Sequence, residues 1–244
     1  MTRYSVDSET REGETLLVLR DGDGPGRAQL WPAWGNNCLA ARLAAPDGGA
    51  VEALLAPDSL DQVRQQPSWW GIPLLFPWPG RIPGGEYAFA GQRYRLPVQD
   101  MNGNAGHGFV KTRPFRVVAT AATEEYAEVR CAISSADHPE TLEGYPFPYL
   151  LATTYRLGAE GLTLDVAVEN SGSGPLPFGF GAHPYFRIPI AAPGRREDCL
   201  VTVPAARRWN LPRIGALGPH FAPSGWRGSE IAIGPAGDTN RRQG

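Results

Sequence analysis

A chain of 244 residues, 42% of them hydrophobic, is long enough to bury one sizeable core. Its 23 basic and 25 acidic residues give a net charge of -2 without a run of like charges, which argues against nucleic-acid binding and against electrostatic docking to a membrane. Glycine and proline, with 30 and 24 residues, exceed their ordinary share and predict many turns between short elements.

The start of the chain and its cysteines bear on where the protein works. Residues 1–20 lack the apolar core of a signal peptide, and no stretch approaches the roughly 20 apolar residues of a spanning helix. Cys38, Cys131 and Cys199 lie far apart without zinc-ligand spacing, so we expect reduced, buried thiols. These features predict a cytoplasmic protein without a membrane partner.

Short β-type segments between turn signals run along most of the chain. We expect strands at residues 14–20, 51–56, 115–120, 126–133, 150–157 and 162–169, and a hairpin at 86–97 that turns at Gly91-Gln92. In segment 162–169, Leu162, Leu164, Val166 and Val168 occupy alternate positions, as in a half-buried strand.

Helical signals are few. The best candidate is segment 59–66, where Asp58 or Ser59 caps the first turn and Pro67 ends the pattern. A further short turn is expected at 139–144. Many strands with few helices predict an all-β fold, a large antiparallel β-sandwich.

The pattern changes near residue 191. Beyond it only 200–203 and 231–233 look like strands, and the remainder has no apolar period. Irregular stretches of this length are uncommon inside domains. We therefore expect residues 1–190 to form the sandwich and 191–244 to be an atypical tail, a truncated or frame-shifted part of the same domain.

Segment 69–85, WWGIPLLFPWPGRIPGG, is stiff, aromatic and non-repetitive, as in a backbone that crosses a core. Arg81 follows Pro79-Gly80, so we expect it on a turn where its guanidinium donors face a cleft. The alternative is an arginine on a solvated loop.

Segment 102–110, NGNAGHGFV, carries a histidine between two glycines. Glycine permits unusual backbone dihedrals, which would let the loop bring the His107 imidazole close to a ligand.

Segment 178–189, FGFGAHPYFRIP, carries the second candidate, His183, which is followed by Tyr185 and Phe186. These rings offer flat apolar faces of the kind that stack on sugar C–H surfaces. A structural histidine is the alternative at this position. His138 and His220 are weaker candidates, because one precedes a proline in a turn and the other lies in the tail.

Other known catalytic motifs are missing from the sequence, which has no GxSxG elbow, no P-loop, no GxGxxG after a strand and no HExxH. Metal binding by His107 and His183 stays open as an alternative, although no acidic or cysteine partner lies at ligand spacing near either histidine.

Taken in order, these segments resemble those of the aldose 1-epimerase (galactose mutarotase-like) family. GIPLLFPWPGRIPGG with the following EYAFAGQRYRLP, then NGNAGHGFVKTRPF, EGYPFPYLLATTYRL and FGFGAHPYFRIP resemble successive family motifs over residues 14–189. Gly80-Arg81 stands where the family more often has Asn-Arg, which places the chain closer to a divergent branch.

The resemblance implies a sandwich of galactose mutarotase type that interconverts the α and β anomers of a free hexose without a metal or redox cofactor. Ring opening needs a proton at the ring oxygen while another leaves the C1 hydroxyl, which suits groups that titrate near neutral pH. By similarity His183 is the general acid, His107 binds the same region, Arg81 anchors sugar hydroxyls, and Tyr185 is a weaker assignment to the cleft wall.

The sequence departs from the family pattern after His183. The family's general base is a glutamate near the C-terminus, preceded by a substrate-binding aspartate, and neither motif is recognisable here. Glu230 is a weak candidate for the base, and Asp238 is no better as the aspartate.

Three hypotheses follow from this departure: a mutarotase, a non-catalytic sugar-binding or regulatory protein that has lost the base, and a destabilised fragment without a function of its own. The sequence leaves open which sugar or sugar phosphate is bound, and the oligomeric state.

Overall fold

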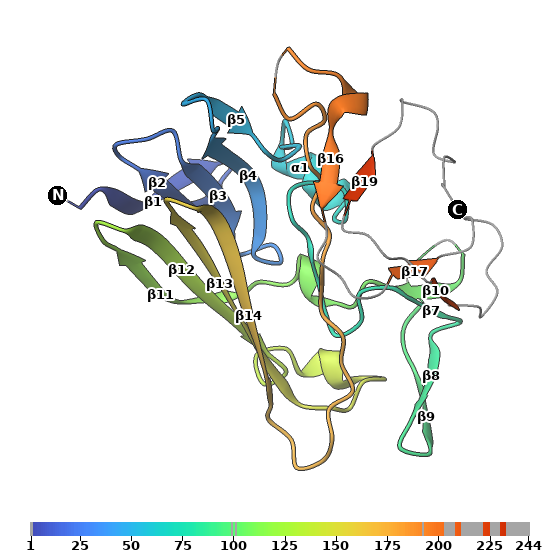
Figure 1. Cartoon of the computed structure of the whole chain (residues 1–244). Helices are drawn as coiled ribbons and strands as arrows, with labels where there is room; N and C mark the ends of the chain where they lie inside the picture. Colours follow the sequence, from blue (N-terminus) through green and yellow to red (C-terminus); the bar gives the residue numbers. More distant parts are fainter. Residues whose placement is uncertain are drawn as a thin grey trace. The chain divides into compact units, whose positions relative to one another are not determined.

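The computed structural model describes residues 2–98, 100, 102–191, 193–202, 208–210, 222–224 and 230–232. The chain divides into two units, Met1–Arg187 and Ile188–Gly244. Figure 1 follows the elements of both along the sequence.

The first unit begins with a five-stranded antiparallel sheet in simple chain order. Its strands are β1 (Tyr4–Arg11), β2 (Glu14–Asp21), β3 (Arg27–Trp31), β4 (Asn37–Ala44) and β5 (Ala50–Glu52). Glu12 and Gly13 form the first turn with φ of 52° and 80°, and positive φ at both positions matches the right-handed twist of a tight hairpin. Residues 14–20 were expected to form a strand, whereas the sequence pattern did not indicate β1, β3 or β4.

A second antiparallel sheet follows, also in chain order. It consists of β11 (Arg116–Ala122), β12 (Tyr126–Ser134), β13 (Tyr149–Gly158) and β14 (Gly161–Asn170). The alternation expected in β14 is confirmed, because Leu162, Leu164, Val166 and Val168 pack against the core while Thr163 and Asp165 are exposed. Strands β12, β13 and β14 contain the segments expected from the sequence, and β11 begins one residue later than the expected 115–120.

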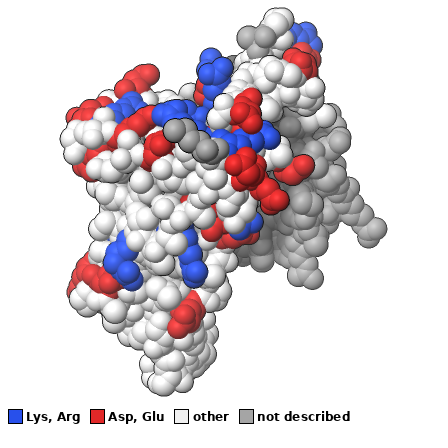
Figure 2. Space-filling view, turned by 90° about the vertical axis from the view of Figure 1, so that its left-hand side faces the viewer, with Lys and Arg blue, Asp and Glu red and all other residues white. Residues whose placement is uncertain are grey.

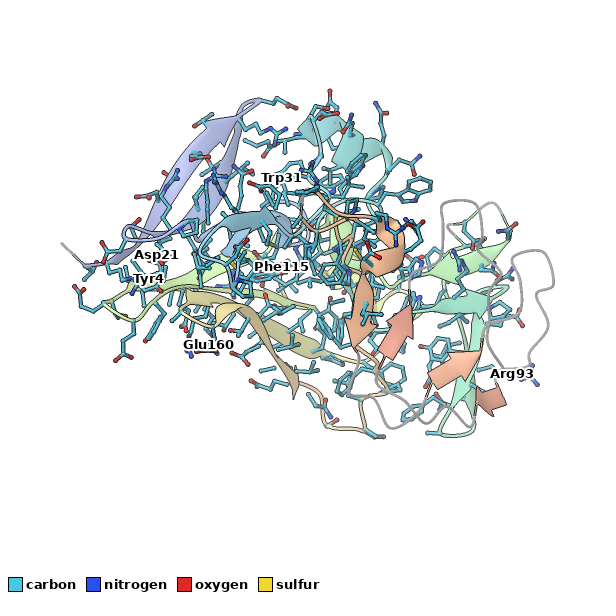
Figure 3. The ribbon with its side chains drawn as sticks, turned by 45° about the horizontal axis from the view of Figure 1, so that its top comes forward. Tyr4, Asp21, Trp31, Arg93, Phe115 and Glu160 are labelled. Carbon is cyan, nitrogen blue, oxygen red and sulfur yellow. The ribbon has the colours of Figure 1, made fainter. Side chains whose placement is uncertain are left out.

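The core lies between these two sheets. Leu19 and Leu30 from the first sheet and Val129 and Tyr155 from the second are fully buried in one hydrophobic cluster. Tyr4 and Phe115, labelled in Figure 3, belong to the same cluster. Two sheets that bury their inner faces against each other form a β-sandwich, so the all-β prediction is confirmed.

The connection between the sheets contains the short elements that build the site. They are α1 (Leu60–Gln65), β6 (Leu74–Leu75), β7 (Arg81–Pro83), β8 (Glu86–Phe89), β9 (Gln92–Arg95), β10 (Asn104–Gly106) and the 3-10 helix η1 (Val110–Thr112). The expected helix is confirmed: the Ser59 hydroxyl accepts a hydrogen bond from the Gln62 amide at 3.3 Å, which caps the first turn of α1. A 3-10 helix, η2 (Pro139–Leu142), occupies the turn expected at 139–144.

Two details of these elements correct the sequence-based prediction. The hairpin turns at Ala90-Gly91, one residue earlier than expected, because Phe89 pairs with Gln92 and the positive φ values fall at Ala90 and Gly91. The strand expected at 51–56 ends at Glu52, because the chain then leaves β4 and the Leu55 amide donates to the Tyr185 carbonyl at 2.8 Å.

The second unit has little regular structure in its described residues. The 3-10 helix η3 (Arg196–Asp198) precedes β16 (Leu200–Thr202), which pairs with β19 (Glu230–Ala232), and β17 (Arg208–Asn210) pairs with β18 (Ala222–Ser224). The two short strands expected at 200–203 and 231–233 therefore form one antiparallel pair.

The three thiols are free, as expected, but they are not all buried. Cys38 and Cys131 lie fully inside the sandwich, and burial raises the pKa of each thiol to about 12. Cys199 is partly exposed, because it follows η3, whose residues face solvent. The expectation of burial was wrong for Cys199.

Charges of both signs lie beside one another on the face shown in Figure 2. Arg3 and Asp21 pair at 2.8 Å, and Arg27 and Glu9 at 2.7 Å, both from the first sheet and the residues that precede it. Over the described residues, no helix combines the length and apolar character needed to cross a membrane.

Candidate functional site

A cavity of about 350 Å³ opens on the first unit, and four of the candidate residues line it: Arg81, His107, His183 and Tyr185. Its charged and titratable lining consists of Arg81, Asp100, His107, Lys111, His183 and Tyr185. The two histidine rings meet edge to face with their centroids 5.9 Å apart. Residues separated by 76 positions in sequence are thus neighbours in one cleft.

The central segment 71–83 holds both histidine-bearing segments in place. On one side β6 pairs with β15 (Gly181–Ala182), the two residues before His183, and the His183 amide donates to the Pro73 carbonyl at 2.9 Å. On the other side β7 pairs with β10, and the His107 amide donates to the Gly80 carbonyl at 2.8 Å. One stiff, proline-rich strand path therefore positions Arg81 and both imidazoles.

The His107 ring is fixed by a hydrogen bond of its own. Nδ1 lies 2.9 Å from the Pro79 carbonyl oxygen, and because a carbonyl can only accept, Nδ1 carries the proton. In the neutral ring Nε2 is then the free acceptor. Burial lowers the pKa of His107, the positive charges of Lys111 and Arg81 lower it further, and the hydrogen bond to Pro79 opposes them. The balance favours the neutral imidazole.

The turn that carries His107 depends on backbone that few residues tolerate. His107 has φ of 62° and Gly108 has φ of 65°. A Cβ on Gly108 would lie 1.9 Å from the Phe76 carbonyl oxygen, so no side chain fits there. The Phe109 amide donates to the same carbonyl at 3.0 Å, which closes the turn against the central segment. The expectation that glycine is needed for an unusual backbone is confirmed at position 108.

His183 is held in a different way. Its Nδ1 is buried and has no hydrogen-bond partner among the described residues. The ring stacks on Tyr185, with centroids 5.1 Å apart and planes 28° from parallel. The Tyr185 amide in turn donates to the Gly71 carbonyl at 2.9 Å. Stacking fixes the plane of the His183 ring, while Nδ1 has no partner among the described residues.

Arg81 and Asp100 form a charged pair at the cavity. Arg81 Nε lies 3.4 Å from Asp100 Oδ2, and the arginine side chain is 46% exposed. Oδ1 accepts from the backbone amides of Asn102 and Asn104 at 3.0 and 2.7 Å, and Oδ2 accepts from Asn104 Nδ2 at 3.0 Å. Burial alone would raise the pKa of Asp100, but these hydrogen bonds and Arg81 lower it. A carboxylate held in this way is a weak base.

The sequence analysis did not assign Asp100, Lys111 or Trp69 to the site, although all three line the cavity. Trp69 is 58% exposed at the cavity, although it opens the segment that the sequence singled out. Lys111 is the one lysine in the sequence and lies in η1, four residues beyond His107. Its being the one lysine and its closeness to His107 in sequence could have drawn attention to it. Its position in the cleft, however, follows from the turn at Gly108, which only the structure shows.

The remaining candidates are not brought to this cavity by the described residues. Glu230 lies in β19 of the second unit, and its side chain is outside the described part of the chain, as are Asp238 and His220. His138 precedes η2 and faces the Pro114 carbonyl and Glu140. Within the described ranges no three His, Cys, Asp or Glu side chains cluster as metal ligands would.

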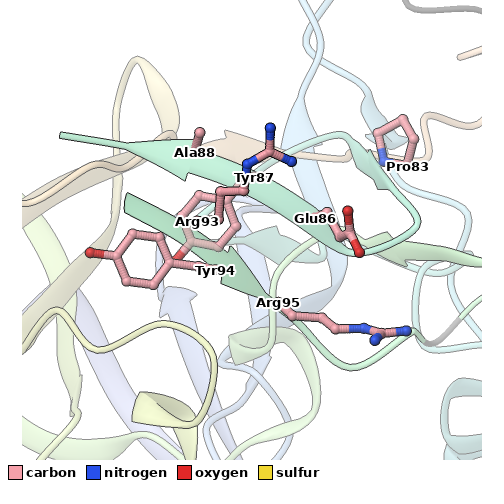
Figure 4. A pocket seen from close by; sticks show the side chains of 7 residues that line it. All are labelled: Pro83, Glu86, Tyr87, Ala88, Arg93, Tyr94 and Arg95. Carbon is pink, nitrogen blue, oxygen red and sulfur yellow. The ribbon is translucent and has the colours of Figure 1, made fainter. Parts of the chain in front are cut away.

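A second hollow, of about 660 Å³, lies along the hairpin of β8 and β9 (Figure 4). Tyr87 and Tyr94 stack there with centroids 5.0 Å apart. It is larger than the histidine cavity, but no histidine lines it and its surface is open. Because proton transfer near neutral pH calls for imidazoles, we place the candidate site in the smaller cavity.

Comparison with known proteins supplies the family. The model of the family described as aldose 1-epimerase matches residues 35–214. The chain is 34% identical over 114 residues to the uncharacterized protein YihR of Escherichia coli K12, a match that covers 46% of this chain and 34% of YihR.

Solved structures show the same fold. A galactose mutarotase-like protein of Clostridium acetobutylicum superposes with a TM-score of 0.77 at 21% identity, covering 94% of this chain and 65% of that one. For a galactose 1-epimerase of Lactobacillus acidophilus the TM-score is 0.58 at 18% identity, with coverage of 76% and 53%. The matched parts make up less than two thirds of each relative. The family model nevertheless spans most of this sequence, and the chain belongs to the aldose 1-epimerase family.

Proposed function

We propose that this chain interconverts the α and β anomers of a free aldose at the cavity between His107 and His183. The observation that carries the proposal is the pair of imidazoles, which lie 5.9 Å apart in a cavity that also holds an arginine. A ring oxygen between them would be within reach of both rings.

In this proposal His183 delivers the proton to the ring oxygen. Its ring plane is set by Tyr185 and its Nδ1 is buried, so in this proposal Nε2 is the nitrogen that gives the proton and recovers it. His107 binds the same part of the sugar through Nε2, the acceptor left by its bond to Pro79. Arg81 donates to sugar hydroxyls and Tyr185 forms part of the wall.

Opening the hemiacetal also requires a base at the C1 hydroxyl. Asp100 is the one carboxylate that lines the cavity among the described residues, and its lowered pKa and its hydrogen bonds make it a positioning group. Glu230 stays a weak candidate for the base. After rotation about C1–C2 the ring closes to the other anomer, so the reaction requires proton transfers alone and calls for no metal or redox cofactor.

The pair of histidines in the cavity also fits a second candidate function. A cleft that keeps its histidines but has no available carboxylate would bind a sugar without turning it over. A carbohydrate-binding or regulatory protein is therefore the alternative. Both functions predict saturable sugar binding, but only the mutarotase is expected to accelerate the interconversion of anomers, so a rate measurement distinguishes them.

The test follows the optical rotation of fresh α-glucose or α-galactose toward equilibrium, after subtraction of the rate in buffer. A mutarotase accelerates the approach, and His183→Asn lowers kcat by about 10²- to 10⁴-fold, the usual contribution of a positioned acid. His138→Asn is the matched control, since this histidine lies away from the cavity. Saturable binding by ligand-observed NMR without acceleration establishes the alternative. Acceleration that survives His183→Asn rejects the role of His183.

A further inference from the structure

Lys111 is a cation that the proposed reaction does not use. It is the one lysine in the chain, and it lies on the wall of the cavity in η1. Its ammonium group is partly buried, and its hydrogen bond to the Gly106 carbonyl is long, at 3.5 Å. Among the described residues no carboxylate pairs with it. Taking a cation out of water without a counter-charge is costly unless something else compensates it.

The charges around the cavity are unbalanced. Arg81 is a second cation, close enough that its charge lowers the pKa of Lys111, in addition to the effect of burial. Asp100 is the one carboxylate on the described wall, and its oxygens already accept three hydrogen bonds and face Arg81. Two cations against one committed anion leave the cavity with a net positive charge.

On the basis of the proposed function, we infer that the sugar taken by this cavity carries an anionic group, a phosphate, sulfonate or carboxylate, which Lys111 and Arg81 hold. Lysine and arginine are the usual partners of such groups, and charge-assisted hydrogen bonds are about twice as strong as neutral ones. A neutral sugar would leave the charge of Lys111 uncompensated.

The position of the anion on the sugar follows from the neighbours of Lys111. Its Nζ lies 3.5 Å from the carbonyl oxygen of Gly106, the residue before His107, and both side chains line the same cavity. His107 is proposed to bind the region of the ring oxygen. In a hexopyranose the exocyclic carbon C6 is bonded to C5, which carries the ring oxygen, so a C6 substituent lies next to that region. The geometry therefore favours a hexose with its anion at C6.

Binding can be tested without catalysis by using ligands that have no anomeric hydroxyl. Reductive methylation with ¹³C-formaldehyde keeps the positive charge of lysine and labels Lys111 as the single lysine signal, apart from the α-amino group. The probes are 1,5-anhydroglucitol 6-phosphate, 1,5-anhydroglucitol and inorganic phosphate. We expect the Lys111 signal to shift with the 6-phosphate and to saturate at a concentration about tenfold or more below that of the neutral compound, as one net charged hydrogen bond provides.

Two variants assign the effect to the side chain. Lys111→Met keeps the length of the side chain and removes its charge. The preference for 1,5-anhydroglucitol 6-phosphate over 1,5-anhydroglucitol should therefore fall by about tenfold in this variant, whereas Lys111→Arg should retain most of the preference. Since neither variant carries the label, these affinities are measured by calorimetry on unmodified protein. Arg93→Met is the control, because Arg93 lies in the hairpin of Figure 4, outside the cavity.

Equal affinity for the neutral and phosphorylated compounds overturns the inference, and so does inorganic phosphate that binds as tightly as the sugar phosphate. The 6-sulfonate and the uronic acid then distinguish which anion is preferred. Selective binding of the 6-phosphate without acceleration of mutarotation would reject the isomerase and leave this inference standing. Accelerated mutarotation with equal affinity for the neutral and phosphorylated compounds would support the isomerase and reject this inference.

Discussion

His107 and His183 reach one cavity from two strand pairs that hold their rings differently. His107 has a left-handed backbone, a ring hydrogen bond to Pro79 and a lowered pKa. His183 follows an ordinary strand pair, and its ring rests on Tyr185 with no hydrogen bond at Nδ1. The first imidazole is locked in one tautomer, while no described group bonds to Nδ1 of the second. The proposed roles, binding for His107 and proton transfer for His183, follow this difference, and variants on each side can test it.

The largest effect is expected on the His107 side from Gly108→Ala. The new Cβ would lie 1.9 Å from the Phe76 carbonyl oxygen in a buried turn with positive φ, so the backbone must move. We expect a loss of more than about 4 kcal/mol in the free energy of unfolding, measured by urea denaturation. Gly106→Ala is the control, because nothing lies within 4 Å of its Cβ position. Similar stability of the two variants would contradict the steric argument.

The His183 side is sensitive to Asn37, which is buried and braces the start of the central segment. Its Oδ1 accepts from the Ile72 amide at 2.8 Å, and its Nδ2 donates to the Trp70 carbonyl at 3.0 Å. Asn37→Leu removes the side-chain donor to the Trp70 carbonyl and leaves the Ile72 amide only its bond to the Cys38 carbonyl at 3.0 Å, so it should cost about 1–3 kcal/mol in urea denaturation. Gln65→Leu, exposed at the end of α1, should change stability little. An equal change in both variants would argue against the brace.

A smaller effect is expected from Tyr185, which sets the plane of the His183 ring. Aromatic pairs contribute about 0.5–1.5 kcal/mol beyond their burial, so Tyr185→Leu should lower kcat/KM for mutarotation by roughly 2- to 12-fold. Tyr185→Phe keeps the ring and should retain nearly full activity. If Phe and Leu lower the rate equally, the hydroxyl and not the stacked ring is what matters at this position.

The smallest effect is the pH dependence of stability through His107. Its pKa is lowered in the folded chain, whereas in the unfolded chain it is about 6.5. Below about pH 6.5 the unfolded state therefore binds more protons, and the free energy of unfolding falls as the pH falls. His107→Gln should make that fall shallower, and His138→Gln serves as the control. A ¹⁵N-edited histidine titration measures the His107 pKa directly, and a value above 6.5 would reject the assignment.

The sequence predicted secondary structure best where a local pattern is sufficient to specify it. Alternation in β14 and capping at Ser59 depend on neighbours a few residues apart, and both appear as expected. The family was visible in four segments spread over residues 14–189. β1 and β3, in contrast, have no clean alternation of apolar and polar residues, and they are strands because they pair with β2. The pairing partner of a strand is not encoded in its own residues.

The sequence by itself determined the chemistry available to this protein: an all-β fold, two histidines beside glycine and aromatic residues, and an arginine after Pro79-Gly80. Only the tertiary structure decided how that chemistry is arranged. It brought His107 and His183 to 5.9 Å, fixed the proton of His107 on Nδ1 and placed Lys111 on the same wall. The physical reason is that these features depend on pairing between segments that are distant in sequence, Arg81 with Gly106 and Leu75 with Gly181, and that burial and neighbouring charges then set the state of each group.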